Sequence, residues 1–340
     1  MAIVLPVTTP TSKPIPLTPF FLRTHGRQAT EEAIRKVVCS VAFELTETEN
    51  AIRLLGSEMS YHCVDPYLPE TLKACYDGMK VADVASFRSS QSDFDLCFED
   101  SWTAYFIARR MAEHRAAKEF VLIHLDDHTD MMSTLLSVSG KQMIDPTSGA
   151  VFDPTSNSDW EAAIRSGAVN IGNYITPFFY SGCKVHVRHV RDAIAESEPM
   201  CVVRCSREYE LIPETQFAAI EMRGSPCDEG VGTYWSGSNP ETLMRTTPNA
   251  WTIIHIDLDY FINDFNGASR GASYVPGQEL RAIALEKMDR FFAAIQKRNP
   301  AIDRWIIATS PGFCCSCHWE FLLSELRRRI VEVRSAQPAG

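Results

Sequence analysis

Two short apolar runs stand out in the hydropathy pattern of this chain, at Phe120–Leu125 and Trp251–Leu258. Neither run alternates between apolar and polar residues, which is typical of a strand buried on both faces of a parallel sheet. Weaker strand patterns follow at Lys184–Val190, Cys201–Arg204 and Trp305–Thr309. We therefore expect a sheet whose centre is covered on both sides.

Segments with helical periodicity lie between and around these strands. Apolar residues recur at helical spacing in six of them, Ala29–Val38, Pro69–Val81, Asp100–Ala117, Ile171–Tyr180, Gln278–Lys297 and His318–Val333. The capping box Ser158–Glu161 predicts a further short helix that ends near Gly167. The Pro- and Thr-rich stretch Thr8–Thr18 predicts an extended arm, and Met131–Asn157 and Asp228–Asn249 are expected to be irregular.

Strands and helices alternate from residue 95 onward, and no internal repeat or low-complexity linker interrupts them. This order predicts an α/β fold with three layers, in which helices cover a mostly parallel central sheet. We expect a single domain over residues 1–340. Within it, residues 1–95 are predicted to form an N-terminal arm and helices.

The composition is that of a soluble globular protein, with 45% hydrophobic and 22% charged residues among 340. No apolar run approaches the ~18–20 residues that a membrane-spanning helix needs. A net charge of −10 argues against nucleic acid as a partner, because phosphate binding requires an excess of Lys and Arg. The first residues lack the pattern of a secretory signal, so we expect a cytoplasmic protein.

The eleven cysteines are an odd number in a large chain, and they are expected to be free thiols in a reducing cytoplasm. The densest group, Cys314–His318, has its ligands closer together than the usual zinc spacing. No second pair is placed to complete a tetrahedron. Zinc is therefore not expected there.

The strongest chemical pattern lies at the ends of the two apolar strands. Asp126, His128 and Asp130 form a D-x-H-x-D string after the first strand, and Asp257 and Asp259 form a D-x-D string at the end of the second. Alternate side chains of an extended chain point the same way, so each string can converge on one point. One such string alone is often a solvated loop. Two strings that each end a buried strand are better explained by a site for Mn²⁺, Mg²⁺ or Fe²⁺.

These strings and their strand context resemble the ureohydrolase superfamily, the arginase and agmatinase type of binuclear manganese enzyme. The resemblance implies an arginase-like fold and two Mn²⁺ ions. It implies that Asp126 and Asp257 bridge the ions, that Asp130 completes one, and that His128 and Asp259 complete the other. A hydroxide between the ions would then attack a guanidinium carbon, releasing urea and leaving an amine.

The family's remaining metal ligand, a histidine in a G-G-D-H string, has no counterpart here. The corresponding stretch is Phe98–Trp102, so a ligand from this position must be Glu99 or Asp100. Both acids also fit the bland interpretation of an acidic pair at a helix N-terminus. The two interpretations stay open.

The surroundings of the strings suggest that arginine is not bound as the free amino acid. Asp130 is followed by Met131–Leu136, without the Asn, Ser and His that hold amino-acid ends in free-arginine enzymes. The stretches Asp126–Met131, Ile256–Phe261 and Ser310–Phe313 are most similar to a branch containing peptide arginases. That branch converts arginine side chains of ribosomal precursor peptides to ornithine. The resemblance therefore implies an arginine-containing precursor peptide as partner, and residues 1–95 are candidates for recognising it.

Other polar residues near the strings have weaker claims. His124 and His255 share the side of the strand that carries the metal strings, and they are either second-layer ligand partners or hydrogen-bonded core histidines. Asp127 points away from its neighbours and is expected to cap or pair. Glu320, on the closing helix, is a candidate partner for a substrate guanidinium, although a solvated helix acid is the default interpretation.

Three other functions fit the same pattern. An arginase-fold deacetylase would use one zinc ion, whereas another ureohydrolase would act on free arginine, agmatine or a formimidoyl substrate. From a different class, a peptide-binding protein could retain the metal site without turnover. A complete ligand set at Glu99 or Asp100 would favour an enzyme.

Overall fold

The computed structural model describes residues 12–336 except for 20, 47, 49, 61, 141, 193–194, 225–226, 246, 248–249 and 267–277. Of the expected arm Thr8–Thr18, residues 8–11 thus lie outside the described part. Among the described residues, no helix is long and apolar enough to cross a membrane.

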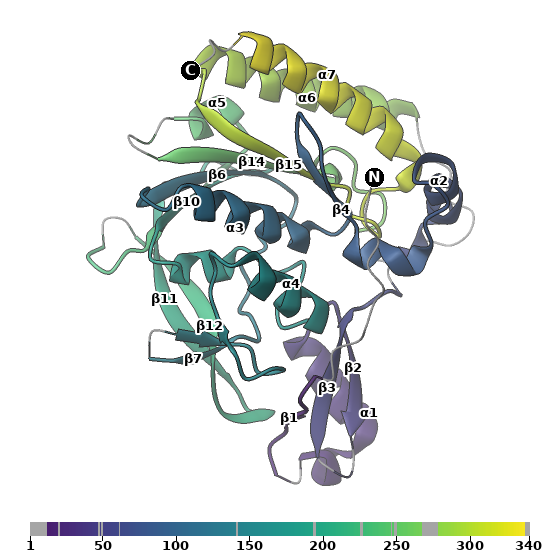
Figure 1. The fold of residues 1–340 in the computed structure, drawn as a ribbon, viewed down its shortest axis with the longest axis vertical. Helices are drawn as coiled ribbons and strands as arrows, with labels where there is room; N and C mark the ends of the chain where they lie inside the picture. The colour runs from purple at the N-terminus through teal and green to yellow at the C-terminus, as the bar shows by residue number, and fades with distance from the viewer. Residues whose placement is uncertain are drawn as a thin grey trace.

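A sheet of twelve strands forms the middle layer (Figure 1). In order across the sheet the strands are β4 (Arg88–Ser90), β5 (Asp95–Cys97), β15 (Ile302–Ala308), β14 (Trp251–Asp257), β6 (Glu119–Leu125), β10 (Lys184–Val190), β13 (Gly232–Gly237), β11 (Met200–Tyr209), β12 (Ile212–Gly224), β7 (Ser137–Ser139), β8 (Gln142–Ile144) and β9 (Val151–Phe152). The six neighbours from β5 to β13 are all parallel. The strands outside them pair in antiparallel fashion.

Helices cover both faces of the parallel centre. Figure 1 shows α6 and α7 on one face and α3 and α4 on the other. On β6, Val121, Ile123 and Leu125 pack in the core beneath α6 and α7, whereas Phe120 and Leu122 pack beneath α3 and α4. This alternation follows from the two-residue period of a strand. Burial on both faces explains why β6 and β14 are nearly continuous apolar runs.

The helices have the following bounds. They are α1 (Phe21–Val37), α2 (Leu68–Cys75), α3 (Thr103–Glu113), α4 (Asn157–Ser166), α5 (Pro240–Leu243), α6 (Gln278–Arg298) and α7 (Trp319–Ala336). Short 3-10 turns lie at His62–Val64, Val81–Ser86, Asp100–Trp102, Thr176–Tyr180, Leu258–Tyr260 and Ser316–His318.

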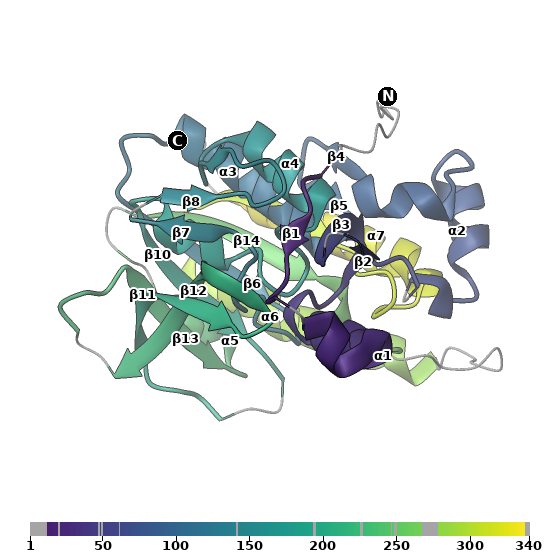
Figure 2. The ribbon, with the colours of Figure 1, turned by 90° about the horizontal axis from the view of Figure 1, so that it is seen from below.

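The N-terminal residues form a small unit beside this sheet (Figures 1 and 2). The strands β1 (Ile15–Pro16), β3 (Ala51–Ser57) and β2 (Val41–Thr46) make a three-stranded sheet that packs on α1. Its core continues into residues of β12, such as Phe217. The unit also lies directly against α4, because a Cβ on Gly167 would come within 2.4 Å of a methyl group of Val41. Gly167 caps α4 at a φ of 83°, a conformation that favours glycine.

The α/β class and the covered, mostly parallel centre of the sheet are confirmed. The strands Phe120–Leu125, Lys184–Val190 and Trp251–Leu258, and the helices at Gln278–Lys297 and His318–Val333, are found within a few residues of the expected bounds. The expected helix Asp100–Ala117 is a 3-10 turn followed by α3, and it ends earlier, at Glu113.

Several expectations about irregular or helical segments are wrong. Met131–Asn157 contains β7, β8 and β9, and Asp228–Asn249 contains β13 and α5. Val41–Thr46 and Ala51–Ser57 pair as the antiparallel strands β2 and β3 rather than forming an arm or helix. Ile171–Tyr180 forms only turns and a 3-10 segment. These strands are short or interrupted by polar residues, so their pattern carries little signal without the neighbouring strand.

Two local expectations also need correction. The cap of α4 is Ser156, which accepts a hydrogen bond from the backbone N–H of Asp159, rather than Ser158. The expectation that every cysteine is free is wrong for Cys201 and Cys227, which form a disulfide.

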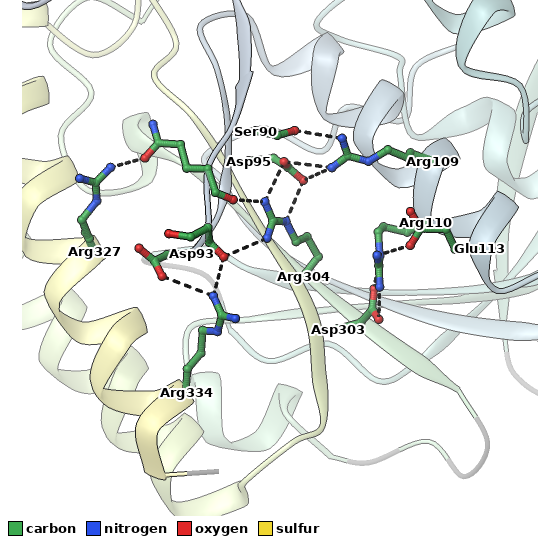
Figure 3. Close-up of polar contacts among 12 residues, drawn as sticks. Ser90, Asp93, Asp95, Arg109, Arg110, Glu113, Asp303, Arg304, Arg327 and Arg334 are labelled. Atoms are coloured by element: carbon green, nitrogen blue, oxygen red, sulfur yellow. Dashed lines mark hydrogen bonds and ion pairs between the residues drawn. The ribbon is translucent and has the colours of Figure 1, made fainter. Parts of the chain in front are cut away.

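A buried ion-pair network ties β5 to the helix α3 and to the neighbouring strand β15 (Figure 3). The Asp95 carboxylate, which is fully buried, accepts hydrogen bonds from Nη2 of Arg109 on α3 at 3.0 and 3.1 Å. It also accepts bonds from Nε and Nη2 of Arg304 on β15, both at 2.9 Å. One bidentate arginine, Arg304, and the Nη2 of Arg109, which is shared between both oxygens, therefore satisfy one buried carboxylate. At the rim of the network, Asp93 pairs with Arg334 in a more exposed setting.

We expect Asp95→Asn to lower the free energy of unfolding by about 3 kcal/mol, because it leaves two partly buried guanidinium groups without their counter-charge. Asp93→Asn is the matched control, with an expected loss below about 1 kcal/mol. Urea denaturation of both variants measures the difference. Equal losses in the two variants would contradict a special role for Asp95.

Candidate metal site

The candidate site lies at one edge of the sheet, where five adjacent parallel strands end. In order across the sheet, β5 leads into Asp100, β15 into Ser310, β14 into Asp257 and Asp259, β6 into Asp126, His128 and Asp130, and β10 into Arg191. Ligands of open α/β sheets bind at this carboxyl edge. The fold therefore gathers side chains that are up to 210 residues apart in the sequence.

Asp126 is the centre of the cluster. Among the described residues, three groups of side chains have ligand atoms within 4.8 Å of one another. Asp126 belongs to each: with Asp100 and Asp130, with His128 and Asp259, and with His124 and His255. Nδ1 of His128 lies 3.0 Å from Oδ2 of Asp259 and 3.4 Å from Oδ1 of Asp126. Each of these groups could hold a metal ion.

The buried carboxylates have too few positive partners to be ionised together. Oδ2 of Asp126 and Oδ2 of Asp130 are buried and have no hydrogen-bond partner among the described residues. Burial, together with the neighbouring aspartates, raises the pKa of Asp126, Asp130, Asp100 and Asp257 well above the usual range. A cation between the unpartnered oxygens would remove this repulsion. The donor set therefore fits hard divalent ions.

Three histidines from adjacent strands lie beneath the carboxylates. His124 of β6 lies directly beside His189 of β10 and His255 of β14 on the neighbouring strands, and all three are buried. Nδ1 of His124 and Nδ1 of His255 are hydrogen-bonded at 2.9 Å, and Tyr174 lies 3.3 Å from the same atom of His255. Burial lowers the pKa of His124 and His255 well below the usual value. These neutral rings cannot supply the positive charge that the carboxylates lack.

His128 differs from the buried histidines because its side chain is 40% exposed. Its hydrogen bond with Asp259 raises the pKa of His128 to about 10 in the absence of a metal.

Nε2 of His124 lies 3.5 Å from the unpartnered oxygens of both Asp126 and Asp130. This places His124 as a direct neighbour of the cluster.

Asp257 is held differently from Asp126. Its Oδ1 accepts a hydrogen bond from the backbone N–H of Asp259 at 3.0 Å, and its Oδ2 accepts one from the hydroxyl of Ser310. Asp257 lines the pocket but belongs to none of the three ligand groups. The structure thus gives its carboxylate protein partners where the resemblance implies a bridge between two ions.

Two site residues adopt a backbone conformation that is uncommon for residues other than glycine. The φ angle is 51° at Asp130 and 46° at Ser310. Such strain costs on the order of 1–3 kcal/mol and is concentrated at functional sites. The backbone N–H of Ser310 is fixed by the carbonyl of Phe98 at 3.0 Å. The strained turns direct both side chains toward the cluster.

A pocket of 380 Å³ opens over the carboxylates. Its polar lining comes from the carboxyl edge of the sheet and includes the half-buried Asp127 and Arg191. Met132, Ile171 and Phe313 contribute apolar walls, and Cys39 and Ser40 of the N-terminal unit complete the rim.

Two predicted site residues are not part of this arrangement. Glu99 points away from the cluster. Its carboxylate lies 3.1 Å from Nε2 of His62 and accepts a hydrogen bond from the hydroxyl of Ser57 at 2.7 Å. Of the two acids considered for the extra ligand, Asp100 is the one that joins the cluster. Glu320 lines a separate hollow between α2 and α7, beside Thr71 and Arg327. The structure therefore does not support Glu320 as a guanidinium partner.

Three features of the site were not expected from the sequence. These are Ser310 as a partner of Asp257, His189 as a member of the histidine row, and Arg191 as a lining residue. Arg191 directly follows the strand β10, so its position at a strand end was a usable signal. The partnership of Ser310 with Asp257 had no such signal, because it depends on the pairing of β14 with β15.

The sequence matches no protein-family model, and no curated protein matches it. A function for this chain therefore rests on the geometry and chemistry of the site.

We expect the protein to bind Mn²⁺ and Asp126→Ala to abolish the binding, because Asp126 is common to all three ligand groups. Metal analysis after dialysis measures the ion content. A free Mn²⁺ concentration a hundredfold above the Kd should stabilise the native protein by about 2.7 kcal/mol, which is detected as a higher Tm.

Asp127→Ala is the matched control. Asp127 directly follows Asp126, but its carboxylate belongs to none of the ligand groups and accepts a hydrogen bond from Asn263 at 3.1 Å. This variant should keep its metal. Full metal content in Asp126→Ala would contradict the assigned site.

Proposed function

We propose that this protein is a metal-dependent hydrolase that converts an arginine residue of a peptide to ornithine, with release of urea. The observation that carries the proposal is the ring of buried, uncompensated carboxylates around Asp126 at the floor of an open pocket. The ring contains residues of both strings that resemble those of ureohydrolases.

Asp126 is the residue best placed to be shared between two ions. Asp100 and Asp130 would hold one ion with it, and His128 and Asp259 the other. Two divalent cations, proposed to be Mn²⁺, supply water of lowered pKa as a nucleophile at neutral pH when they are bound. Ser310 fixes the orientation of Asp257 beside these ligands.

The half-buried Asp127 is the proposed partner of the substrate guanidinium. Its carboxylate lies on the pocket lining, and Asn263 holds one of its oxygens. Its backbone N–H donates to Oδ1 of Asp259 at 3.4 Å, which ties it to the cluster. A carboxylate matches the two parallel N–H groups of a guanidinium. This role replaces the one expected of Glu320.

The pocket walls favour an arginine side chain attached to a larger molecule. The volume of 380 Å³ is in the range of small-ligand sites, and its apolar walls suit the aliphatic stem of arginine. Cys39 and Ser40 place the N-terminal unit at the rim, where a peptide main chain would lie. The described part of the N-terminal unit around Cys39 and Ser40 is therefore the proposed contact for the rest of the peptide.

A second candidate function is hydrolysis of an acyl-lysine amide with a single ion. It is favoured by the compact group Asp126, His128 and Asp259 and by the protein hydrogen bonds that engage both oxygens of Asp257. An ion bound only by that group would leave Asp257 as a positioning residue.

The deciding experiment supplies the Mn²⁺-loaded protein with an arginine-containing peptide, free arginine and an acetyl-lysine peptide in parallel. Urea from the peptide alone, with a mass loss of about 42 Da (CN₂H₂) per event, is the expected result of metal-assisted hydrolysis. Urea from free arginine would replace the peptide substrate with the amino acid. Acetate release alone would favour the second function, and no turnover of any substrate would contradict both.

We expect Asp127→Asn to lower kcat/KM for the arginine peptide by about 10–100-fold, because a charged hydrogen-bond acceptor is lost while the metal is retained. Glu320→Gln is the control and should leave urea release unchanged, since Glu320 lines a different hollow. Steady-state kinetics on both variants provide the measurement. The opposite ranking would restore Glu320 as the guanidinium partner.

A further inference from the structure

A pair of cysteines lies on the loop that follows β15, behind the wall of the pocket. Sγ of Cys315 and Sγ of Cys317 are 2.9 Å apart. A disulfide bond requires ~2.05 Å, so the sulfurs need to approach by less than 1 Å. No ligand group among the described residues includes either thiol, which argues against a metal as the reason for the contact.

The protein holds this loop in place through buried carboxylates. The backbone N–H of Cys315 donates to Asp264 at 2.9 Å, and that of Ser316 donates to Asp65 at 2.7 Å. The thiol of Cys315 also donates to Oδ1 of Asp65 at 3.5 Å. The main chain on both sides of Cys315 is thus fixed, and the backbone N–H of His318 donates to the carbonyl of Cys315 at 3.0 Å, which closes the turn that carries Cys317.

The two thiols differ in exposure and reactivity. Cys315 is fully buried, whereas Cys317 is partly exposed. The hydrogen bond with Cys315 lowers the pKa of Cys317 to about 6, and the neighbouring His318 adds to this effect. Burial raises the pKa of the adjacent Cys314 well above its usual value. Cys317 is therefore the thiolate of the segment, and thiolates are the reactive form.

We propose that Cys315 and Cys317 are a redox-active dithiol that exchanges with low-molecular-weight disulfides, such as oxidised glutathione, and closes into an intrachain disulfide. The Cys317 thiolate attacks one sulfur of glutathione disulfide, which breaks that S–S bond and releases one glutathione thiolate. Cys315 then attacks Cys317 and displaces the second glutathione. Two electrons pass from the pair to the two glutathione molecules. The thiol proton of Cys315 goes to the second glutathione, and the first glutathione thiolate takes its proton from water.

The placement of the pair connects it to the pocket wall. The same loop carries Phe313, whose ring centroid lies 5.1 Å from that of His128, and Ser310, which donates to Asp257. The backbone carbonyl of Phe313 accepts hydrogen bonds from Asp264 and Phe265, and Asp264 also holds Cys315. Oxidation therefore acts on a loop that contributes directly to the pocket.

The test uses the full-length protein with oxidised glutathione, followed by acid quenching, alkylation of free thiols and tryptic digestion. The peptide Trp305–Arg327 contains Cys314, Cys315 and Cys317 and no other cysteine. Before oxidation we expect three alkyl groups on it. After oxidation we expect one alkyl group and a mass lower by two hydrogens at the remaining pair, and reduced glutathione should reverse the change.

Single variants identify the pair and the order of attack. Cys314→Ser should still form the disulfide and retain no alkyl group. Cys315→Ser should hold one glutathionyl group on Cys317, because the second thiol is missing, whereas Cys317→Ser should remain unreacted. Three alkyl groups on the oxidised wild-type peptide would overturn the proposal. So would a disulfide that disappears in Cys314→Ser. Neither result depends on whether the protein releases urea.

Discussion

The repulsion among buried carboxylates at the carboxyl edge of the sheet is the constraint on which the rest of the site depends. Asp126 and Asp130 are buried with unpartnered oxygens, and burial keeps His124 and His255 beneath them neutral. The positive groups at the edge, His128 and Arg191, are outnumbered by aspartates. Such an arrangement is stable at neutral pH only with protons or cations between the oxygens. A divalent ion is the cation that carboxylates and imidazole together select.

The parallel sheet makes this crowding possible because its strands end side by side. Each of the five strands from β5 to β10 contributes a polar residue at or shortly after its carboxyl end, and the cores on both faces keep the strands in register. The positive φ angles at Asp130 and Ser310 then direct the chain around the edge. The network at Asp95 stabilises the outer strand that leads to Asp100. Site geometry and fold stability are therefore linked through β5.

Segments buried on both faces could be predicted from the sequence, whereas strands with a polar face could not. The apolar runs of β6 and β14 predicted buried parallel strands, and the aspartates after them predicted a cluster, because burial on both faces leaves a continuous hydrophobic signal. The antiparallel strands β7 to β9 and β12, and the strand β13 at the border of the parallel centre, gave no comparable signal, since their polar residues resemble those of loops. Asp100 and Glu99 could not be told apart by position alone. Only packing turns Glu99 toward His62 and Asp100 toward the cluster.

Local periodicity and the order of the strings along the chain were enough to predict the α/β class, the central strands and the residue types of the site. The tertiary structure alone decided which residues meet. In the folded chain, Asp126 is the shared member of the cluster, and Ser310 is the partner of Asp257. Glu320 lines a different hollow, and Cys315 lies against Cys317. The reason is physical: strand register and loop conformation depend on contacts between distant segments, and no local pattern of residues encodes these contacts.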